Sequence, residues 1–447
     1  MRFLRQSSTI FVSVRSATSK RMADAKPLAN RLPSEVARSS KTSIWVEFTT
    51  LAAQCQAVNL GQGFPDSRMP PVIADLLEKV AEHPERTDWH QYTRGFGHPR
   101  LVQVLGRLYS RMLGVSVNPM DDILVTVGAY LALYYSCVGW LNQGDEVIVI
   151  EPAYDSYLPQ IRMAGGVPVP ITLDLRPNAT TSADYRLDVA KLKSKLTERT
   201  KMILLNNPNN PTGKLYEREE LEAIAEIARE HDLLVISDEV YEWHVYPGKP
   251  MIRFASLPGM YERTITIGSA GKAFSSTGWK TGWAIGPARL LQPLKAIHQN
   301  VVFTCPTPLQ EAIACAFERE LALIEAGKTE ESYLLTGMAA ELLPKRDRLA
   351  AYLKAAGMNP IVPDAGYFMI ADFQQFDGPF RSGTEDELDF RFVRWLCREK
   401  KLAAIPPSAF YSPEHKKGND HFVRLCFFKK DETLEAAEKI LEHLRAK

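Results

Sequence analysis

The sequence predicts an α/β protein, with a large domain whose mostly parallel sheet carries helices on both faces, followed by a smaller α+β domain. Three observations support this fold class. Short apolar segments alternate with helical segments from about residue 70. Several of the apolar segments end in a polar residue or a glycine. Beyond about residue 325, strands are instead grouped between helices, and 447 residues suffice for two packed domains.

The elements of the large domain follow from their periodicity. Residues 71–82 and 99–113 begin with proline and carry apolar side chains three and four positions apart, as amphipathic helices do. Residues 218–230 form a third such helix, and Gly128 opens a fourth. The predicted strands are short, apolar and mostly β-branched, and they are residues 121–126, 145–150, 201–207, 232–238 and 263–269.

The remaining segments set the expected domain boundaries. A long helical stretch begins at residue 307, and the elements expected after it are strands at 365–373, 402–410 and 422–428 and helices at 386–400 and 431–446. We expect a large domain over residues 66–324 and a small C-terminal domain over residues 325–447. Residues 26–65 would be an arm that packs with the small domain or with a partner subunit.

Composition excludes several classes of partner. The net charge is +1 without a basic block, so no nucleic acid is expected. No apolar run approaches the roughly 20 residues of a membrane-spanning helix. The six cysteines are scattered without a CxxC pair, which indicates buried thiols in a reducing compartment. No metal site is expected.

The N-terminus differs from the rest of the chain. Residues 1–22 hold five basic residues and no acid, which is typical of a mitochondrial presequence, and we expect the targeting segment to end by residue 25. A disordered tail without targeting function is the alternative. A second start at Met22 would give a cytoplasmic product beside the mitochondrial one.

Polar residues or glycines stand where predicted strands end. Gly128, Asn210, Asp238 and Ser269 follow or close four different strands. The carboxyl ends of parallel strands meet at one edge of a sheet, where ligands bind. Lys272 follows between small residues, where its amine can approach a flat ring and form a Schiff base with pyridoxal phosphate (PLP). Taken alone, Lys272 would be read as a solvent-exposed lysine.

Other residues meet the needs of the PLP ring. Asp238 would hold a proton on the ring nitrogen, with an attraction of roughly 4 kcal/mol at an effective dielectric constant of 20. Tyr241 and Asn210 would bind the phenolic oxygen, and Tyr154 would stack on the ring. Without context, Asp238 would be a helix cap or surface turn, Asn210 would lie in an ordinary turn, and Tyr154 would be a half-buried aromatic residue.

Two anion sites complete the constellation. The backbone amides of Ala129 and Tyr130, at a helix start, would bind a phosphate together with the Ser269 hydroxyl and the Lys280 ammonium. Arg424 stands in an apolar strand, so it needs a buried partner, and a substrate carboxylate gripped by two hydrogen bonds is a natural one. A structural ion pair is the alternative.

Together these residues resemble the class I aminotransferases, PLP enzymes of fold type I. The motifs that carry the resemblance are NLGQGFPD, QYTRGFGHPRL, TVGAY, NNPNNPTGK, SDEVYE, SAGKAFSSTGWKTGW and FVRLCFF, which run in the family's order from about residue 40. IWVEF and HQNVVFTCPTPLQEA are similar to the branch of kynurenine aminotransferase, glutamine transaminase K and cysteine-S-conjugate β-lyase. Thr304 stands where one sub-branch has a histidine.

The resemblance implies roles and an assembly. Lys272 would be both the Schiff-base lysine and the base for proton transfer, and Tyr92 would reach the phosphate of the other subunit of a homodimer with shared active sites. The residues implied to bind the substrate are Arg424, Asn210, the backbone of Gly63, and Trp45 in the side-chain pocket.

The expected activity is transamination between a large neutral or aromatic amino acid and a 2-oxo acid. Kynurenine, glutamine, methionine and phenylalanine are the expected donors, because Trp45, Tyr154 and Phe303 offer aromatic walls and no second arginine is found for a distal carboxylate. We also expect the conversion of kynurenine to kynurenic acid and a side activity as a cysteine-S-conjugate β-lyase. The alternatives are a PLP lyase or synthase on the same scaffold, and a PLP-binding regulator without turnover.

Overall fold

The structure is a computed structural model that describes residues 34–39, 43–384 and 386–444. The chain divides into two units, residues 1–42 and 43–447. The described part of the first unit contains the short helix α2 (Glu35–Ser39). The predicted presequence and the last residues of the predicted C-terminal helix lie outside the described residues.

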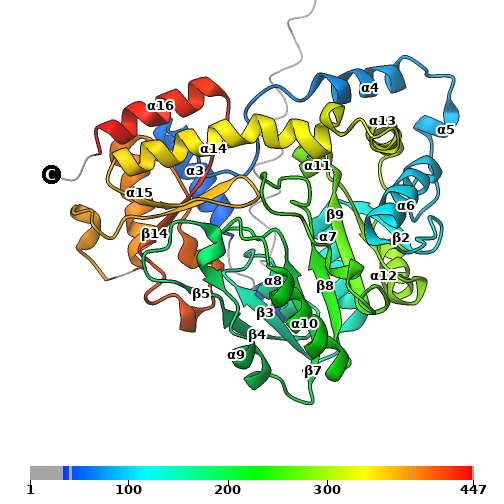
Figure 1. The fold of residues 1–447 in the computed structure, drawn as a ribbon, viewed down its shortest axis with the longest axis horizontal. Helices are drawn as coiled ribbons and strands as arrows, with labels where there is room; N and C mark the ends of the chain where they lie inside the picture. Colours follow the sequence, from blue (N-terminus) through cyan, green and yellow to red (C-terminus); the bar gives the residue numbers. More distant parts are fainter. Residues whose placement is uncertain (1–33, 40–42, 385, 445–447) are drawn as a thin grey trace, which may run out of the picture. The chain divides into compact units, whose positions relative to one another are not determined.

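A seven-stranded sheet organises the second unit (Figure 1). The strand order is β2-β10-β9-β8-β7-β3-β4, and every neighbouring pair is parallel except the two that involve β10. The bounds are β2 Ile123–Val127, β3 Glu146–Glu151, β4 Val167–Thr172, β7 Thr200–Asn206, β8 Leu234–Asp238, β9 Thr264–Ser269 and β10 Thr281–Ile285. The predicted α/β class with a mostly parallel sheet is confirmed.

Alternate side chains of the central strands enter two different hydrophobic cores. On β3, Val149 packs in the core that contains Ala132 of α7 (Ala129–Trp140), whereas Ile148 packs in the core that contains Leu221 of α10 (Arg218–Glu230). Successive side chains of a strand point to opposite faces. Helices therefore cover both faces of the sheet, and this explains why its strands read as continuous apolar runs.

The strongest sequence signals give the best helix boundaries. The predicted helix at residues 99–113 is α6 (Pro99–Leu113). Gly114, with a φ of 70°, caps its C-terminal end. The predicted helix at residues 71–82 is α4 (Pro71–Ala81). The other helices are α3 Ile44–Cys55, α5 Thr87–His90, α8 Tyr157–Met163, α9 Val189–Ser194, α11 Ala270–Ala273, α12 Ala288–Val301, α13 Thr307–Glu325, α14 Met338–Ala355, α15 Leu388–Lys400 and α16 Asp431–Glu442.

The C-terminal third carries an antiparallel three-stranded sheet of order β11-β12-β14. Its strands are β11 Asn359–Ile361, β12 Phe368–Asp372 and β14 Phe422–Cys426. Two short pairs lie apart from it: β1 (Val58–Asn59) with β13 (Leu402–Ala403), and β5 (Asp174–Leu175) with β6 (Tyr185–Arg186). The predicted boundary between large and small domains stays a prediction.

The prediction of a strand at residues 402–410 is wrong beyond residue 403. Only β13, a two-residue strand, forms there, and Pro407–Phe410 is a short 3-10 helix. Pro406 and Pro407 lack the backbone N–H that a sheet ladder requires, so the apolar pattern does not continue as a strand.

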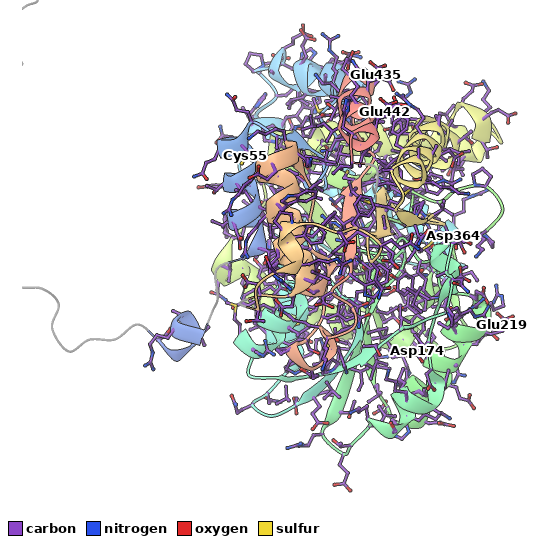
Figure 2. All side chains as sticks on the ribbon, turned by 90° about the vertical axis from the view of Figure 1, so that its left-hand side faces the viewer. Cys55, Asp174, Glu219, Asp364, Glu435 and Glu442 are labelled. Carbon is purple, nitrogen blue, oxygen red and sulfur yellow. The ribbon has the colours of Figure 1, made fainter. Side chains whose placement is uncertain are left out.

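The surface and the thiols agree with the composition. None of the described helices is long and apolar enough to span a membrane. Exposed carboxylates such as Asp174, Glu219 and Glu435 lie on the outside of the molecule (Figure 2). Cys137, Cys305, Cys397 and Cys426 are buried as predicted, whereas Cys55 and Cys315 are half-buried.

Candidate active site

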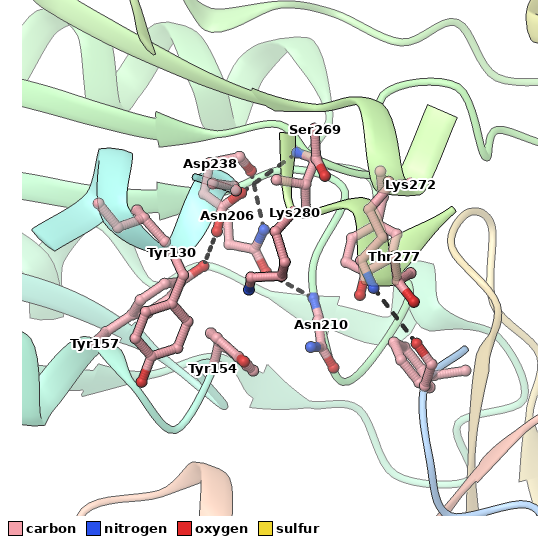
Figure 3. A pocket seen from close by; sticks show the side chains of 18 of the residues that line it. Tyr130, Tyr154, Tyr157, Asn206, Asn210, Asp238, Ser269, Lys272, Thr277 and Lys280 are labelled. Carbon is pink, nitrogen blue, oxygen red and sulfur yellow. Dashed lines mark hydrogen bonds between the residues drawn. The ribbon is translucent and has the colours of Figure 1, made fainter. Parts of the chain in front are cut away.

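The strand ends meet at one edge of the seven-stranded sheet. Asp238 closes β8, Ser269 closes β9, Gly128 follows β2 and Asn210 lies four residues beyond β7. The antiparallel strand β10 begins at this same edge, so Lys280, which precedes it, arrives there too. These residues surround a cavity of about 290 Å³ (Figure 3).

The cavity brings together every predicted site residue except Tyr92 and Phe303, the latter predicted as an aromatic wall but 57% exposed and outside the lining. The predicted residues that line it are Trp45, Gly63, Ala129, Tyr130, Tyr154, Asn210, Asp238, Tyr241, Ser269, Lys272, Lys280 and Arg424. Tyr92 is 84% exposed, and its ring contacts Phe303 at a centroid distance of 5.5 Å. Its predicted reach into another subunit stays a prediction.

Asp238 is a buried carboxylate that makes no ion pair within the described residues. Its Oδ2 accepts a hydrogen bond of 2.6 Å from the Tyr157 hydroxyl, and its Oδ1 accepts one of 3.3 Å from the amide of Val240 (Figure 3). Burial raises the pKa of Asp238 to about 6, although both hydrogen bonds act against that rise. A cation placed beside this carboxylate would lower its pKa again.

Lys272 is half-buried on the short helix α11 that follows β9. Its Nζ donates hydrogen bonds of 2.7 Å to the Tyr367 hydroxyl and 3.4 Å to the Gly63 carbonyl. Desolvation is the main cause that lowers the pKa of Lys272 to about 8. At pH 7 roughly a tenth of such amines are unprotonated, far more than for an ordinary lysine, so this one is prepared to act as a nucleophile or base.

The start of α7 forms an anion cradle. The first amides of a helix have no intrahelical acceptor, so those of Ala129 and Tyr130 can bind an anion. A Cβ at Gly282 would lie 2.4 Å from the Ala129 nitrogen, and one at Gly128 would lie 3.3 Å from the Lys280 Nζ. Glycines at these two positions keep the amides and the ammonium close to one another.

Arg424 is fully buried and lines the same cavity. Its Nη1 donates to the Asn210 Oδ1 at 3.0 Å and its Nη2 to the Gly61 carbonyl at 2.9 Å. Its guanidinium carbon lies 4.0 Å from the ring centre of Phe368 and 5.1 Å from that of Trp45. No described carboxylate forms an ion pair with Arg424, and its Nε has no hydrogen-bond partner. The structural ion pair considered above is therefore not formed.

Several cavity residues were not predicted. Asn206 orders the loop after β7, since its Oδ1 accepts from the Asn210 amide at 2.7 Å and its Nδ2 donates to the Asp238 carbonyl at 2.9 Å. Tyr157 lies only three residues after Tyr154. This short spacing was the feature of the sequence that could have identified Tyr157 as a second residue of the site. Thr277 and Phe368 also line the cavity.

Comparisons with known proteins agree with this geometry. Residues 56–440 match the family described as aminotransferase class I and II. The chain is 48% identical to human kynurenine–oxoglutarate transaminase 3 over 405 residues, which cover 90% of this chain and 88% of that protein. It is 45% identical to human kynurenine–oxoglutarate transaminase 1 over 406 residues, 89% of this chain and 94% of that protein.

A solved structure extends the likeness to the fold. YbdL from Escherichia coli, for which a methionine aminotransferase function has been identified, is 30% identical, with a TM-score of 0.80 that covers 93% of this chain and 100% of YbdL. The family match spans most of the chain, and the cavity carries the lysine, the acid and the arginine that the sequence predicted. The chain belongs to the class I and II aminotransferases.

Proposed function

We propose that the cavity holds pyridoxal phosphate. Three of its features fit the three parts of this cofactor: Asp238 suits a protonated ring nitrogen, Lys272 suits the aldehyde, and the start of α7 with Ser269 and Lys280 suits the phosphate. Tyr154 and Tyr241 would flank the ring and its oxygen. When bound, the cofactor supplies a carbonyl group for the amino group and a ring that stabilises the negative charge left by the departing α-proton.

The protein's own residues would do the rest of the work. Arg424 and Asn210 bind and orient the substrate carboxylate. Lys272 takes the proton from the substrate α-carbon and returns it elsewhere in the same half-reaction. Asp238, held by Tyr157, keeps a positive charge in place at the ring.

We propose that the amino donor is a large neutral or aromatic amino acid, with kynurenine, glutamine, methionine and phenylalanine as the class. The observation that carries this proposal is the wall around Arg424, where Trp45 and Phe368 lie against the guanidinium. The kynurenine transaminases among the relatives and the methionine aminotransferase among the neighbours support it. Kynurenine would yield kynurenic acid, and a donor with a leaving group on its β-carbon would undergo elimination.

Asp155 gives a physical reason for excluding acidic donors. This half-buried carboxylate accepts a hydrogen bond of 3.1 Å from the Trp45 indole nitrogen. Its negative charge therefore stands directly behind the aromatic wall of the cavity. A second carboxylate on the substrate would meet this charge instead of a cation, so aspartate is expected to be a poor donor.

A panel of amino donors with a common 2-oxo acid tests the proposal. We expect higher specificity constants for kynurenine, glutamine, methionine and phenylalanine than for aspartate. A specificity constant for aspartate above all four would refute the donor class. Absorbance between roughly 360 and 430 nm that shifts on addition of an amino acid distinguishes a working enzyme from a regulator that only binds the cofactor.

We also propose a homodimer whose subunits complete each other's sites. Tyr92 and Phe303 are an exposed aromatic pair, at 84% and 57% exposure, that a partner subunit would cover. Sedimentation should give twice the chain mass, and Tyr92→Ala should weaken cofactor retention. A fully active monomer would contradict the proposal.

For residues 1–25 we propose a mitochondrial targeting role, with initiation at Met22 giving a cytoplasmic form. The basic, acid-free composition of residues 1–22 supports it. A fusion of residues 1–30 to a fluorescent reporter should enter mitochondria, and a reporter that stays cytosolic would overturn the idea.

A further inference from the structure

One tyrosine outside the cavity lining contacts the reactive amine. The Tyr367 hydroxyl accepts a hydrogen bond of 2.7 Å from the Lys272 Nζ and donates one of 2.9 Å to the Gly63 carbonyl. The Lys272 Nζ also reaches that carbonyl at 3.4 Å. With its phenolic proton donated to Gly63, the oxygen of Tyr367 acts as an acceptor towards Lys272, and the Tyr241 hydroxyl is its third hydrogen-bond neighbour.

This arrangement decides what a neutral amine at Lys272 can do. A neutral lysine amine has two N–H groups and one lone pair. The Tyr367 hydroxyl and the Gly63 carbonyl are two acceptors, so they engage both N–H groups. The lone pair is then left without a partner and is free to receive a proton.

The hydroxyl is held rigidly. Tyr367 is 1% exposed, and its ring packs at centroid distances of 5.3 Å from Tyr241 and 5.2 Å from His244. The next residue, Phe368, opens β12 and lies against the Arg424 guanidinium. Two consecutive residues therefore fix the amine at one point and the carboxylate-binding arginine at another, which sets the separation between them.

We propose that Tyr367 is a positioning residue that holds the free Lys272 amine, through its hydroxyl, for proton transfer from the substrate α-carbon. In this step the Cα–H bond breaks, a new N–H bond forms on the Lys272 Nζ, and the electron pair of the broken bond stays on the substrate. Tyr367 keeps its own proton throughout, because burial raises its pKa well above the ordinary value.

The first test is kinetic, and it rests on the proposed transamination. Tyr367→Phe removes one oxygen and leaves the ring packing intact. We expect kcat with the best donor to fall about 10- to 100-fold and KM to change less than about threefold, because orientation is lost and not binding. The isotope effect on kcat with the α-deuterated donor should increase. Unchanged kcat and isotope effect would overturn the proposal.

Tyr246→Phe is the matched control. Tyr246 is 3% exposed, and its hydroxyl donates a hydrogen bond of 2.6 Å to the carbonyl of Gly366, the residue next to Tyr367. The same atom is removed from the same neighbourhood without touching Lys272. We expect wild-type kcat for Tyr246→Phe. The unfolding temperatures of Tyr246→Phe and Tyr367→Phe should be similar to each other. An equal loss of kcat in both variants would show that the effect is structural and would contradict the positioning role.

A second readout needs no donor and no turnover. The pKa of Lys272 can be followed in the cofactor-free protein by the ¹³C shift of labelled lysine, assigned by its absence in Lys272→Ala. The groups that face this amine are Asp238, Lys280, Arg424, Cys426, His244, Tyr241 and Tyr367.

Tyr367→Phe leaves all of these charges in place and removes an acceptor that favours the ammonium form. We expect the pKa of Lys272 to fall by about one unit in this variant and to stay unchanged in Tyr246→Phe. An unchanged pKa in Tyr367→Phe would overturn the proposal. Because this experiment uses no substrate, a failed donor panel would leave its outcome intact.

Discussion

Two sets of buried charged side chains differ in whether they form an ion pair within the protein. In the cavity, Asp238 and Arg424 are buried and form no ion pair within the described residues. Elsewhere in the same fold, Lys214 contacts Glu220 at 2.8 Å and Arg253 contacts Glu242 at 2.9 Å.

The difference separates structural charges from functional ones. Leaving a charge buried without a partner is costly, whereas a closed pair is tolerated. Lys214 and Arg253 each have an ion-pair partner in the protein, whereas Asp238 and Arg424 have none among the described residues. We infer that a ligand supplies the counter-charges of Asp238 and Arg424. The ring cation of the proposed cofactor and the carboxylate of the proposed substrate have the required charges.

The largest effect is expected from removal of the reactive amine. Lys272→Ala should lower kcat by more than about 10⁴-fold, because nucleophile and base are lost together. The variant should still bind PLP noncovalently through Lys280, Asp238 and Ser269. Steady-state rates and equilibrium dialysis with PLP check the two parts. Near-wild-type turnover would place the chemistry on another residue.

Asp238→Asn should have the next largest effect on activity. Loss of roughly 4 kcal/mol of attraction for the ring cation corresponds to a fall in kcat of about 10³-fold. The cofactor-free variant should be at least as stable as the wild type, because a desolvated charge is gone. Thermal unfolding of both cofactor-free proteins measures this. A large loss of stability would mean that Asp238 is a structural residue.

Breaking one of the buried ion pairs, Lys214–Glu220 or Arg253–Glu242, should lower stability and leave activity unchanged. Glu220→Gln leaves the Lys214 ammonium, which is 0% exposed, without its counter-charge, so the free energy of unfolding should fall by about 3–5 kcal/mol. The specific activity of the folded fraction should stay near that of the wild type. Urea unfolding and active-site titration together distinguish these outcomes, and loss of kcat at full folding would break the comparison.

A smaller effect is expected from pH. The pKa of Asp238 lies at about 6 in the folded protein, above the ordinary value of 3.8, so the folded state binds more protons between these values. The contribution of Asp238 to stability is therefore present at low pH and is lost as the pH rises from about 4 to 6. Urea unfolding of the cofactor-free wild type and Asp238→Asn across this window should show the difference, and PLP should reduce it. Parallel curves would contradict the assignment.

The sequence was most informative where local chemistry decides structure. Apolar periodicity located α6 and α10, and polar residues after apolar runs located the edge of the sheet where the cavity lies. The antiparallel strand β10 was not predicted, although it is the element that brings Lys280 to that edge. A strand's direction depends on its neighbours in space, which a single sequence does not display.

The same limit applies to the second layer of the site. Tyr157, in a turn-rich segment, and Tyr367, in an apolar one, read as ordinary aromatic residues, and the roles proposed for them come from the atoms that they meet across the fold. Tyr157 meets Asp238 over 81 positions of sequence, and Tyr367 meets Lys272 over 95. Residues with intrinsic charge were predictable because burying a charge demands an explanation, whereas burying a tyrosine does not.

Identification of the lysine that carries the cofactor tests most directly whether Lys272 is the reactive amine. The purified protein would be loaded with PLP, reduced with borohydride, digested and examined by peptide mass spectrometry. We expect a pyridoxyl group on the peptide that contains Lys272, and no label in Lys272→Ala. A label on Lys280 or another lysine, or none on the wild type, would contradict it.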